Sequence, residues 1–183
     1  MSDEMIVLHG SPTLAGLKTA NLFNCSYGGR DDLMASLRSL NKRLGPKGVR
    51  VIPLRVSREK VLLYVYRPDK LQNDFAVKEA AELLREYGYS VQNPGKCIAQ
   101  LSRRLKECEE FPHEIGLFLG YPPEDVRGFI KNHARGYKCV GCWKVCGDEA
   151  SAKAQFERYR KCTDIYCSQW AKGKSIERLT VAV

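Results

Sequence analysis

Two short segments of the chain carry residue types from which a small binding or catalytic site could be built. In residues 11–18, two hydroxyl groups and a lysine follow an apolar stretch, and such groups bind anions together with the amides of a turn. In the second segment, His113 and Glu114 are adjacent. An imidazole exchanges a proton near neutral pH, and a carboxylate orients it. These residue types predict an anion-binding turn and an acid–base pair.

We expect the two segments to border one cleft, between the turn at residues 11–18 and a corner at residues 113–121. Lys18 would hold the anionic group of a small ligand, His113 would exchange a proton and Glu114 would orient it. The candidate catalytic residues are His113, Glu114 and His9. The candidate ligand-binding residues are Ser11, Thr13, Lys18, Tyr121 and Trp143. Because a lone histidine is often hydrogen-bonded scaffolding, the sequence leaves open whether the protein is an enzyme.

The glycines of residues 10–19, GSPTLAGLKT, resemble a phosphate-binding loop but miss its spacing. A P-loop needs its lysine directly after the second glycine, so that the backbone amides wrap the phosphates. Here Leu17 stands between Gly16 and Lys18. The spacing argues against a nucleotide-hydrolysing P-loop. It leaves two interpretations open, a looser anion site and an ordinary strand-to-helix turn with an exposed lysine, and it favours the second.

Five of the eight cysteines gather in the C-terminal third of the chain, namely Cys139, Cys142, Cys146, Cys162 and Cys167. The spacing of the first three is similar to that of zinc or iron–sulfur ligands. If residues 137–145 form a strand, however, Cys139 and Cys142 point to opposite faces, and Cys142 lies ~13 Å from Cys146. We therefore interpret these thiols as small core residues and expect no metal, unless a tight turn at residues 140–141 brings them together. The sequence names no cofactor.

Residues 114–129 also fit the register of a helix-turn-helix, with a small residue at Gly116 and a turn glycine at Gly120. The second helix would begin with Glu124 and Asp125, which place negative charge against the phosphates and offer little base-reading chemistry. A nucleic-acid-associated regulator is therefore an alternative that the sequence does not favour. A noncatalytic adaptor that docks a protein on a helix face is a third hypothesis.

The composition is that of a globular protein with an excess of positive charge. The chain has 44% hydrophobic residues and a net charge of +9, which favours small anionic ligands or nucleic acid as partners. No apolar run approaches the ~18 residues of a membrane span, and the apolar stretch near the N-terminus is too short for a secretory signal. We expect a cytoplasmic protein with reduced cysteines and no membrane partner.

The pattern along the chain predicts a single α+β domain over residues 1–183, with a small mixed sheet packed against several helices. Runs of β-branched and aromatic residues predict strands at residues 5–9, 21–27, 49–56, 61–66 and 137–145. Periodic apolar residues and capping residues predict helices at residues 31–44, 76–87, 94–105 and 148–172. The domain is thus expected to be sheet-rich at residues 1–66 and 137–146 and helical at residues 67–134 and 148–172.

Four stretches carry a resemblance to a known family. They are LHGSPTLAGLKTANLF (residues 8–23), VYRPDKL (65–71), FPHEIGLFLGYPPEDVRGFI (111–130) and GCWKVCGDEASAKAQFERYRKCTDIY (141–166). The sequence resembles a bacterial family, domain of unknown function 3793, over nearly the whole chain. The resemblance implies no known activity, cofactor or partner. It implies that these residues belong to recurring motifs: His9, Pro12, Thr13, Gly16, Lys18, His113, Glu114, Gly120, Tyr121 and Trp143.

Two positions depart from the pattern of that family. The family pattern has a cysteine where this chain has Gly10, and a tyrosine where it has Cys146. The first departure removes a cysteine nucleophile, and the second argues against Cys146 as a metal ligand shared with relatives.

Overall fold

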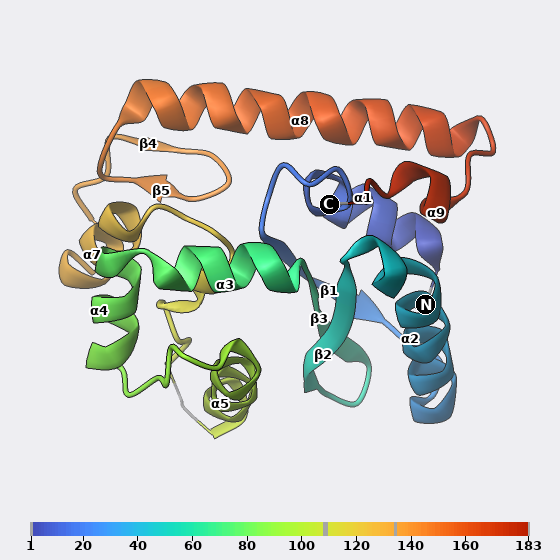
Figure 1. The fold of residues 1–183 in the computed structure, drawn as a ribbon, viewed down its shortest axis with the longest axis horizontal. Helices are drawn as coiled ribbons and strands as arrows, with labels where there is room; N and C mark the ends of the chain where they lie inside the picture. Colours follow the sequence, from blue (N-terminus) through green and yellow to red (C-terminus); the bar gives the residue numbers. More distant parts are fainter. Residues whose placement is uncertain (1, 108–109, 134, 183) are drawn as a thin grey trace. The chain divides into compact units, whose positions relative to one another are not determined.

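The computed structural model describes residues 2–107, 110–133 and 135–182, and Figure 1 shows its helices and strands. In chain order these are α1 (Asp3–Leu14), β1 (Ala20–Ser26), α2 (Arg30–Leu44), the 3-10 helix η1 (Gly45–Lys47), β2 (Arg50–Val56), β3 (Lys60–Tyr66), α3 (Pro68–Ala76), α4 (Lys78–Glu86), α5 (Pro94–Glu107), α6 (Ile115–Phe118), α7 (Pro123–Lys131), β4 (Cys139–Val140), β5 (Lys144–Val145), α8 (Glu149–Ala171) and α9 (Ile176–Leu179). The predicted α+β class is confirmed. Among the described residues, no helix is both long and apolar enough to span a bilayer.

The elements group into two compact units. The first unit comprises the residues up to 69 and those from 159 onward, and the second comprises residues 70–158. Helix α8 therefore contributes its first turns to the second unit and the remainder to the first. The expected single domain stays a prediction, and each unit is described separately below.

The first unit is built on a three-stranded sheet with the order β1-β3-β2. Both pairs of strands are antiparallel, where a mixed sheet was expected. The hairpin between β2 and β3 turns at Ser57, whose backbone N–H donates to the carbonyl oxygen of Lys60 at 2.8 Å. The strands predicted at residues 21–27, 49–56 and 61–66 are confirmed.

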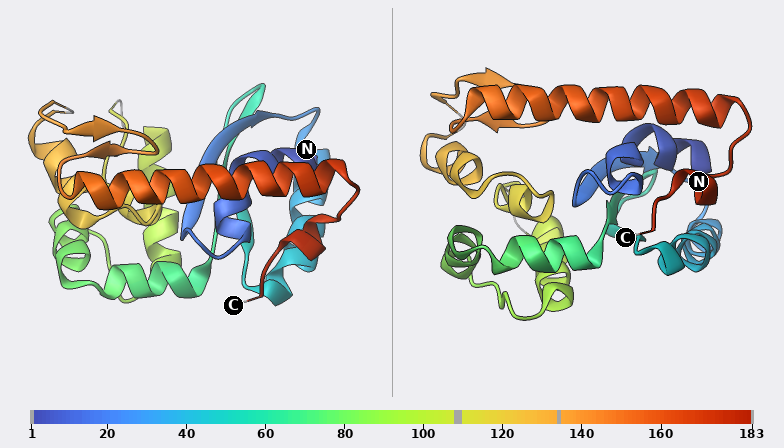
Figure 2. Two further views of the ribbon diagram at one scale, coloured as in Figure 1. Left: turned by 90° about the horizontal axis from the view of Figure 1, so that it is seen from above. Right: turned by 45° about the horizontal axis from the view of Figure 1, so that its top comes forward.

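One buried apolar cluster joins the sheet to helices α1, α2 and α9. Helix α1 lies alongside β1 and next to α9 (Figure 2). The buried side chains of this cluster include Ile6, Val7, Leu14, Phe23, Leu33, Leu37, Leu40, Leu44, Val61, Leu63, Val65, Ile176 and Leu179. The four leucines of α2 recur at helical spacing, so one face of this helix enters the core. The helix predicted for this segment is confirmed.

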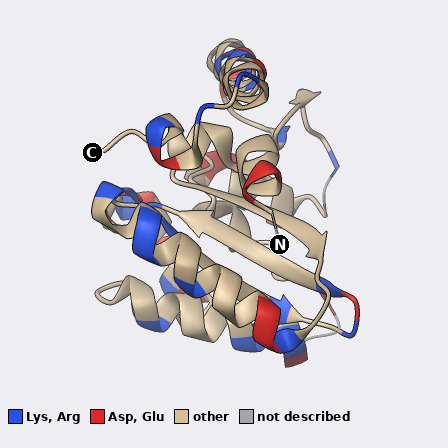
Figure 3. Ribbon diagram, turned by 90° about the vertical axis from the view of Figure 1, so that its right-hand side faces the viewer, with Lys and Arg blue, Asp and Glu red and all other residues tan. Residues whose placement is uncertain are grey.

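The charges of α2 match the dipole of a helix. Asp31 and Asp32 lie in its first turn, and Lys42 and Arg43 lie in its last turn. Figure 3 shows the acidic residues at one end of this helix and the basic residues toward the other. Acidic groups near the positive N-terminus and basic groups near the negative C-terminus each stabilise a helix.

Residues 5–9, predicted as a strand, lie inside helix α1 instead. Ile6, Gly10 and Leu14 are buried at four-residue intervals, and a Cβ atom on Gly10 would lie 3.6 Å from a methyl carbon of Val65. A short apolar run fits a strand or a buried helix equally well when it is considered alone. Here the buried face of the helix packs on β1 and β3, and this tertiary packing accompanies the helical conformation.

The outer edge of β2 is protected by a side chain of α2. The amide of Asn41 accepts from the backbone N–H of Val51 at 2.9 Å and donates to the Val51 carbonyl oxygen at 2.7 Å. Two residues further along the strand, Pro53 lacks a backbone N–H and so cannot donate a hydrogen bond to another strand. Because an open strand edge is a template for pairing with another chain, both features limit edge-to-edge association.

Arg67 follows β3 and connects three segments of the first unit, with only 2% of its surface exposed. Its guanidinium donates to the backbone carbonyl oxygens of Thr13 at 2.7 Å, Leu14 at 2.8 Å, Lys47 at 3.1 Å and Val181 at 2.7 Å. The first two carbonyls end helix α1, where the last C=O groups have no partner within the helix. Burial lowers the pKa of Arg67, although an arginine remains charged.

The second unit begins with helices that pack around aromatic side chains. The ring of Phe118 meets those of Phe75 and Tyr89 edge-on, with centroids 5.0 Å and 5.4 Å apart. Helices α4 and α5 confirm two predictions, and the Asn93 side chain caps α5 by accepting from the backbone N–H of Lys96 at 3.0 Å. Helix α3, between β3 and α4, lies in the region predicted as helical, although no separate helix was predicted there.

Residues 137–145, predicted as one strand, form the short antiparallel hairpin of β4 and β5. The chain reverses at residues 141–143, and only glycine fits at position 141, because a Cβ atom there would come within 2.1 Å of the ring of Phe156. The glycine therefore permits a close contact that a strand pattern does not reveal. The long helix predicted after this segment is confirmed as α8, and Asp148 caps it by accepting from the backbone N–H of Ser151 at 3.1 Å.

We predict that the Arg67→Met variant lowers the free energy of unfolding by about 3–5 kcal/mol, because four backbone carbonyl groups lose the hydrogen bonds that the guanidinium donates. Urea denaturation followed by circular dichroism measures this change. The matched control is Arg58→Met, which replaces an exposed arginine of the β2–β3 turn and should change stability by less than about 0.5 kcal/mol. Equal denaturation midpoints for the Arg67→Met variant and the wild type would contradict the prediction.

Candidate functional site

The carboxylate of Asp125 joins helix α7 to the β4–β5 hairpin. Asp125 lies in the first turn of α7 and is 3% exposed. Its Oδ2 atom accepts from the indole N–H of Trp143 at 2.6 Å, and its Oδ1 atom accepts from the backbone N–H groups of Cys146 and Gly147 at 2.7 Å each. Three N–H donors satisfy a buried carboxylate well. They fix the position of the hairpin against α7.

Trp143 also lies at the centre of an aromatic cluster. Its ring stacks on Tyr121, with centroids 4.8 Å apart, and meets Phe156 edge-on at 4.5 Å. The Tyr121 hydroxyl donates to the carbonyl oxygen of Cys142 at 3.0 Å, which holds the turn of the hairpin. Trp143 is therefore fixed by packing as well as by Asp125.

The corner between α6 and α7 is tight because Gly116 has no side chain. A Cβ atom at this position would lie 2.7 Å from a methyl carbon of Val126 and 3.1 Å from the ring of Tyr121. The sequence pattern required a small residue here, and the structure gives the physical reason. The close approach brings the start of α7 next to the segment that carries His113.

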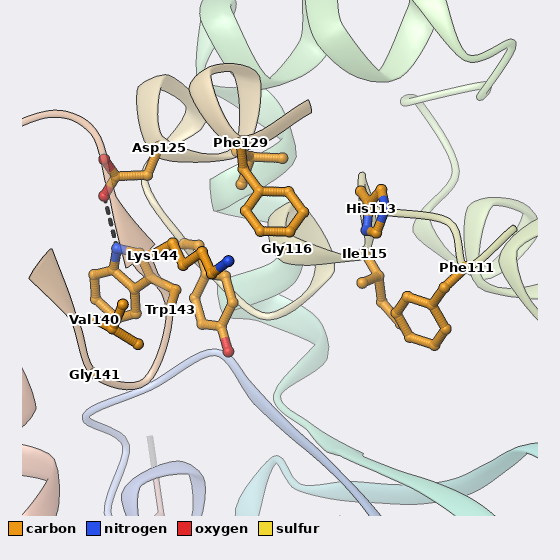
Figure 4. Close-up of a pocket in the computed structure, with 12 residues that line it drawn as sticks. Phe111, His113, Ile115, Gly116, Asp125, Phe129, Val140, Gly141, Trp143 and Lys144 are labelled. Carbon is orange, nitrogen blue, oxygen red and sulfur yellow. Dashed lines mark hydrogen bonds between the residues drawn. The ribbon is translucent and has the colours of Figure 1, made fainter. Parts of the chain in front are cut away.

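A pocket of about 410 Å³ opens in the second unit between this corner and the hairpin. Its lining is mostly aromatic and aliphatic: Phe111, His113, Ile115, Gly116, Tyr121, Asp125, Val126, Phe129, Val140, Gly141, Trp143 and Lys144. Figure 4 shows His113 and Phe111 on one side of the pocket, Trp143 and Lys144 on the other, and Phe129 between them. The structure thus brings together three predicted site residues, His113, Tyr121 and Trp143.

His113 is exposed and belongs to the aromatic wall of the pocket. Its ring meets Phe129 edge-on, with centroids 4.9 Å apart, and lies 6.3 Å from the ring of Phe111. An imidazole in this position is accessible both to solvent and to a ligand in the pocket.

Lys144 supplies the positive charge of the lining. Its Nζ atom lies 4.7 Å from the ring centroid of Tyr137 and 5.6 Å from that of Phe129. An ammonium group over aromatic faces is attracted by the negative electrostatic potential of the rings. These contacts hold the charged group beside the pocket.

Glu114, predicted to orient His113, is buried and makes other contacts. Its Oε1 atom accepts from the hydroxyl of Tyr89 at 2.8 Å and lies 3.1 Å from Nε of Arg104 in an ion pair. Burial, followed by the nearby charge of Glu114, raises the pKa of Tyr89, so that this hydroxyl remains a donor. Both contacts hold the segment before α6 against the core of the second unit, so the Glu114 carboxylate has a structural role.

The candidate residues of the first segment belong to the first unit, where the fold uses their side chains. Residues 11–14 are the end of helix α1 and not a turn, which corrects the predicted conformation. The buried Ser11 hydroxyl donates to the carbonyl oxygen of Val7, and the buried Thr13 hydroxyl donates to Asn21 at 2.7 Å. Both hydroxyl groups therefore support the packing of α1.

His9 and Lys18 also make contacts within the first unit. The His9 ring stacks on Phe23 with centroids 4.7 Å apart. Lys18 is buried, and its Nζ atom lies 5.8 Å from the ring centroid of Tyr159. Because the two predicted segments fall in different units, the shared cleft stays a prediction.

Sequence reasoning missed Phe129 and Lys144 as pocket residues, and it gave Asp125 no part in the site. In the sequence, Asp125 has the pattern of an acidic residue in the first turn of a helix. Its hydrogen-bond partners in and after the hairpin lie 18 to 22 positions further along the chain. No local pattern encodes such a contact. The sequence feature that could have located the pocket is the dense succession of aromatic residues, glycines and prolines in residues 111–130, because it indicates a tight corner.

The cysteines differ in burial more than the sequence predicted. Cys25, Cys97 and Cys162 are buried, but Cys142 is exposed at the hairpin turn, so the core interpretation is wrong for it. Burial raises the pKa of the Cys162 thiol to about 11. Within residues 2–107, 110–133 and 135–182, no group of three or more His, Cys, Asp or Glu side chains is arranged to hold a metal ion.

The corner does not present α7 as an open recognition helix. Asp125 in its first turn is bonded to the hairpin, and a Cβ atom on Gly128 would lie 2.7 Å from Cβ of Cys146. A helix that reads a DNA groove needs this N-terminal part free for the bases. The hairpin covers that side of α7.

Taken together, the fold and the pocket define an α+β protein with an aromatic, lysine-bearing cavity in its second unit. The chain belongs to the family described as Protein of unknown function (DUF3793), whose model matches residues 6–180. The resemblance seen in the sequence motifs is thereby confirmed. Comparisons with curated proteins and with solved structures gave no match.

We predict that Asp125→Ala destabilises the protein by about 3 kcal/mol and exposes Trp143, because the buried indole N–H and two half-buried backbone N–H groups lose their acceptor. The measurements are urea denaturation and the emission wavelength of Trp143 in a Trp170→Phe background, which should shift to the red. Glu124→Gln is the control, since Glu124 is the exposed carboxylate next in sequence. A blue, unshifted emission in Asp125→Ala would show that this carboxylate does not hold the hairpin.

We also predict that iodoacetamide at pH 8 modifies Cys142 well before Cys162. The raised pKa of Cys162 reduces its thiolate fraction at this pH, and burial limits access, whereas Cys142 is exposed. Peptide mass spectrometry over a time course measures both rates in one sample. Urea-unfolded protein is the control, in which the two rates should approach each other. Faster labelling of Cys162 in the native protein would refute the assigned burial.

Proposed function

We propose that the second unit binds a small, largely apolar molecule in the pocket between the α6–α7 corner and the β4–β5 hairpin. The observation that carries this proposal is the lining of a cavity of about 410 Å³ by aromatic and aliphatic side chains with one lysine. Small-molecule sites are typically concave and apolar, with a few polar groups that orient the ligand. The expected cytoplasmic location is part of the same proposal.

The rigidity of the walls supports this function. Trp143 is held by Asp125 and by stacking on Tyr121, and Gly116 allows the corner to close tightly. A site whose walls are already ordered loses little conformational freedom when a ligand enters. The pocket is therefore preorganised for binding.

Proton transfer by His113 extends the proposal to catalysis. The imidazole is exposed and lines the pocket, so it has access to a ligand. The predicted orientation by Glu114 draws no support from its contacts, which are to Tyr89 and Arg104. Binding is therefore the main proposal.

The helix-turn-helix alternative is less well supported than ligand binding. It requires an accessible first turn of α7, and Asp125 in that turn is bonded to Cys146 and Gly147 of the hairpin. The adaptor hypothesis stays a prediction made from the sequence.

We predict that a screen of aromatic fragments finds ligands that shift the indole N–H signal of Trp143 in ¹H–¹⁵N spectra of the whole chain. The chain has two tryptophans, so the Trp170→Phe variant assigns the signal. Phe129→Ala removes one wall and should weaken binding by about two- to tenfold, the size of an aromatic contact.

The control for this test is Val77→Ala, an exposed position of the second unit outside the pocket lining. It should bind the same fragments with unchanged affinity. If no fragment at millimolar concentration moves the Trp143 signal, or if Phe129→Ala binds as well as the wild type, the pocket is not a ligand site.

A further inference from the structure

The rings around the pocket favour a planar guest. His113, Tyr121, Phe129 and Trp143 all contribute to its walls, and aromatic groups prefer offset-stacked or edge-to-face contacts with another ring. A volume of about 410 Å³ lies toward the small end of typical ligand pockets, which suits a molecule with one or two fused rings.

The charges of the lining favour an acidic group on that ring. Two lining residues carry a formal charge, Asp125 and Lys144. The Asp125 carboxylate accepts three hydrogen bonds from the hairpin, which satisfy it and direct it away from a guest. The Lys144 ammonium group lies beside the pocket, over the rings of Phe129 and Tyr137, and it is the positive charge of the lining.

The segment from the middle of α7 through the hairpin, residues 126–147, is basic, and it is bordered by Glu124 and Asp125 before it and by Asp148 and Glu149 after it. Residues 126–147 contain no Asp or Glu, and their cationic residues are Arg127, Lys131, Arg135, Lys138 and Lys144. A local excess of one sign attracts ligands of the opposite sign and repels those of the same sign. A cationic ligand would also compete with the Lys144 ammonium for the faces of Phe129 and Tyr137. The aromatic walls are therefore better suited to an anion than to a quaternary ammonium group.

From these observations we infer that the ligand of the pocket is a planar aromatic acid, whose ring lies among the aromatic walls and whose carboxylate or phosphate group pairs with Lys144. This inference rests on the proposed function and adds the chemical class of the ligand. The ring supplies most of the buried contact area, and the ion pair selects the acid over its neutral analogues.

The experiment compares three probes that share one ring system: 2-naphthoate, 2-naphthyl phosphate and the neutral 2-naphthamide. Dissociation constants are measured with the whole chain from the shift of the Trp143 indole N–H signal. We expect the preferred anion to bind roughly fivefold more tightly than the amide, the effect of one partly exposed ion pair. The order of the two anions then identifies a carboxylate or a phosphate as the natural acidic group.

Two variants test the assignment to Lys144. Lys144→Met should lose the preference for the anions over the amide, and the amide binding that it retains shows that the pocket is folded. Lys131→Met is the matched control, because Lys131 is an exposed lysine of the same basic segment outside the pocket lining, and it should keep the preference.

The outcomes separate this inference from the proposed function. If all three probes bind equally to the wild type, or if Lys144→Met keeps the preference, the inferred ligand class is wrong while the pocket remains a binding site. If none of the probes shifts the Trp143 signal and the aromatic fragments also fail to shift it, the proposed function itself is overturned.

Discussion

A buried carboxylate must find donors, and this requirement at Asp125 determines the architecture of the candidate site. The three donors that satisfy it come from Trp143, Cys146 and Gly147, on a separate hairpin. Because all three bonds must form together, the hairpin has one position against α7. That position places Trp143 and Lys144 on one side of the pocket and His113 on the other (Figure 4). Without the carboxylate, two short strands would have little to hold them, since an isolated hairpin is marginally stable in water.

The same physical rule, with the opposite charge, organises the first unit. Arg67 is a buried cation whose donors meet carbonyl oxygens at the end of α1, at the 3-10 helix and near the C-terminus. Apolar burial supplies most of the driving force for folding, but it has no direction. Hydrogen bonds to a buried charge do have direction, and they select one arrangement among the many that would bury the same apolar surface.

Local sequence patterns were sufficient to predict the helices and strands whose own residues show a clear periodicity or a capping signal. The leucines of α2, the paired runs of β2 and β3 and the capped start of α5 were all predicted from the sequence. The patterns failed at α1 and at the β4–β5 hairpin. In α1 a short apolar run is ambiguous, and packing of Gly10 against Val65 favours the helix. In the hairpin, Phe156 of helix α8 leaves no room for a side chain at Gly141, and no local pattern shows this contact.

For the candidate site, residue types and motifs were enough to identify side chains with versatile chemistry and the family to which the chain belongs. His113, Tyr121 and Trp143 were named from their types and motifs, and they line one pocket. The tertiary structure alone decided the remainder: Ser11 and Thr13 use their hydroxyl groups within the fold, and Phe129 and Lys144 complete the pocket. The reason is that residue type and local spacing are properties of a segment. Burial and hydrogen-bond satisfaction are instead properties of the neighbours that a segment acquires when the chain folds.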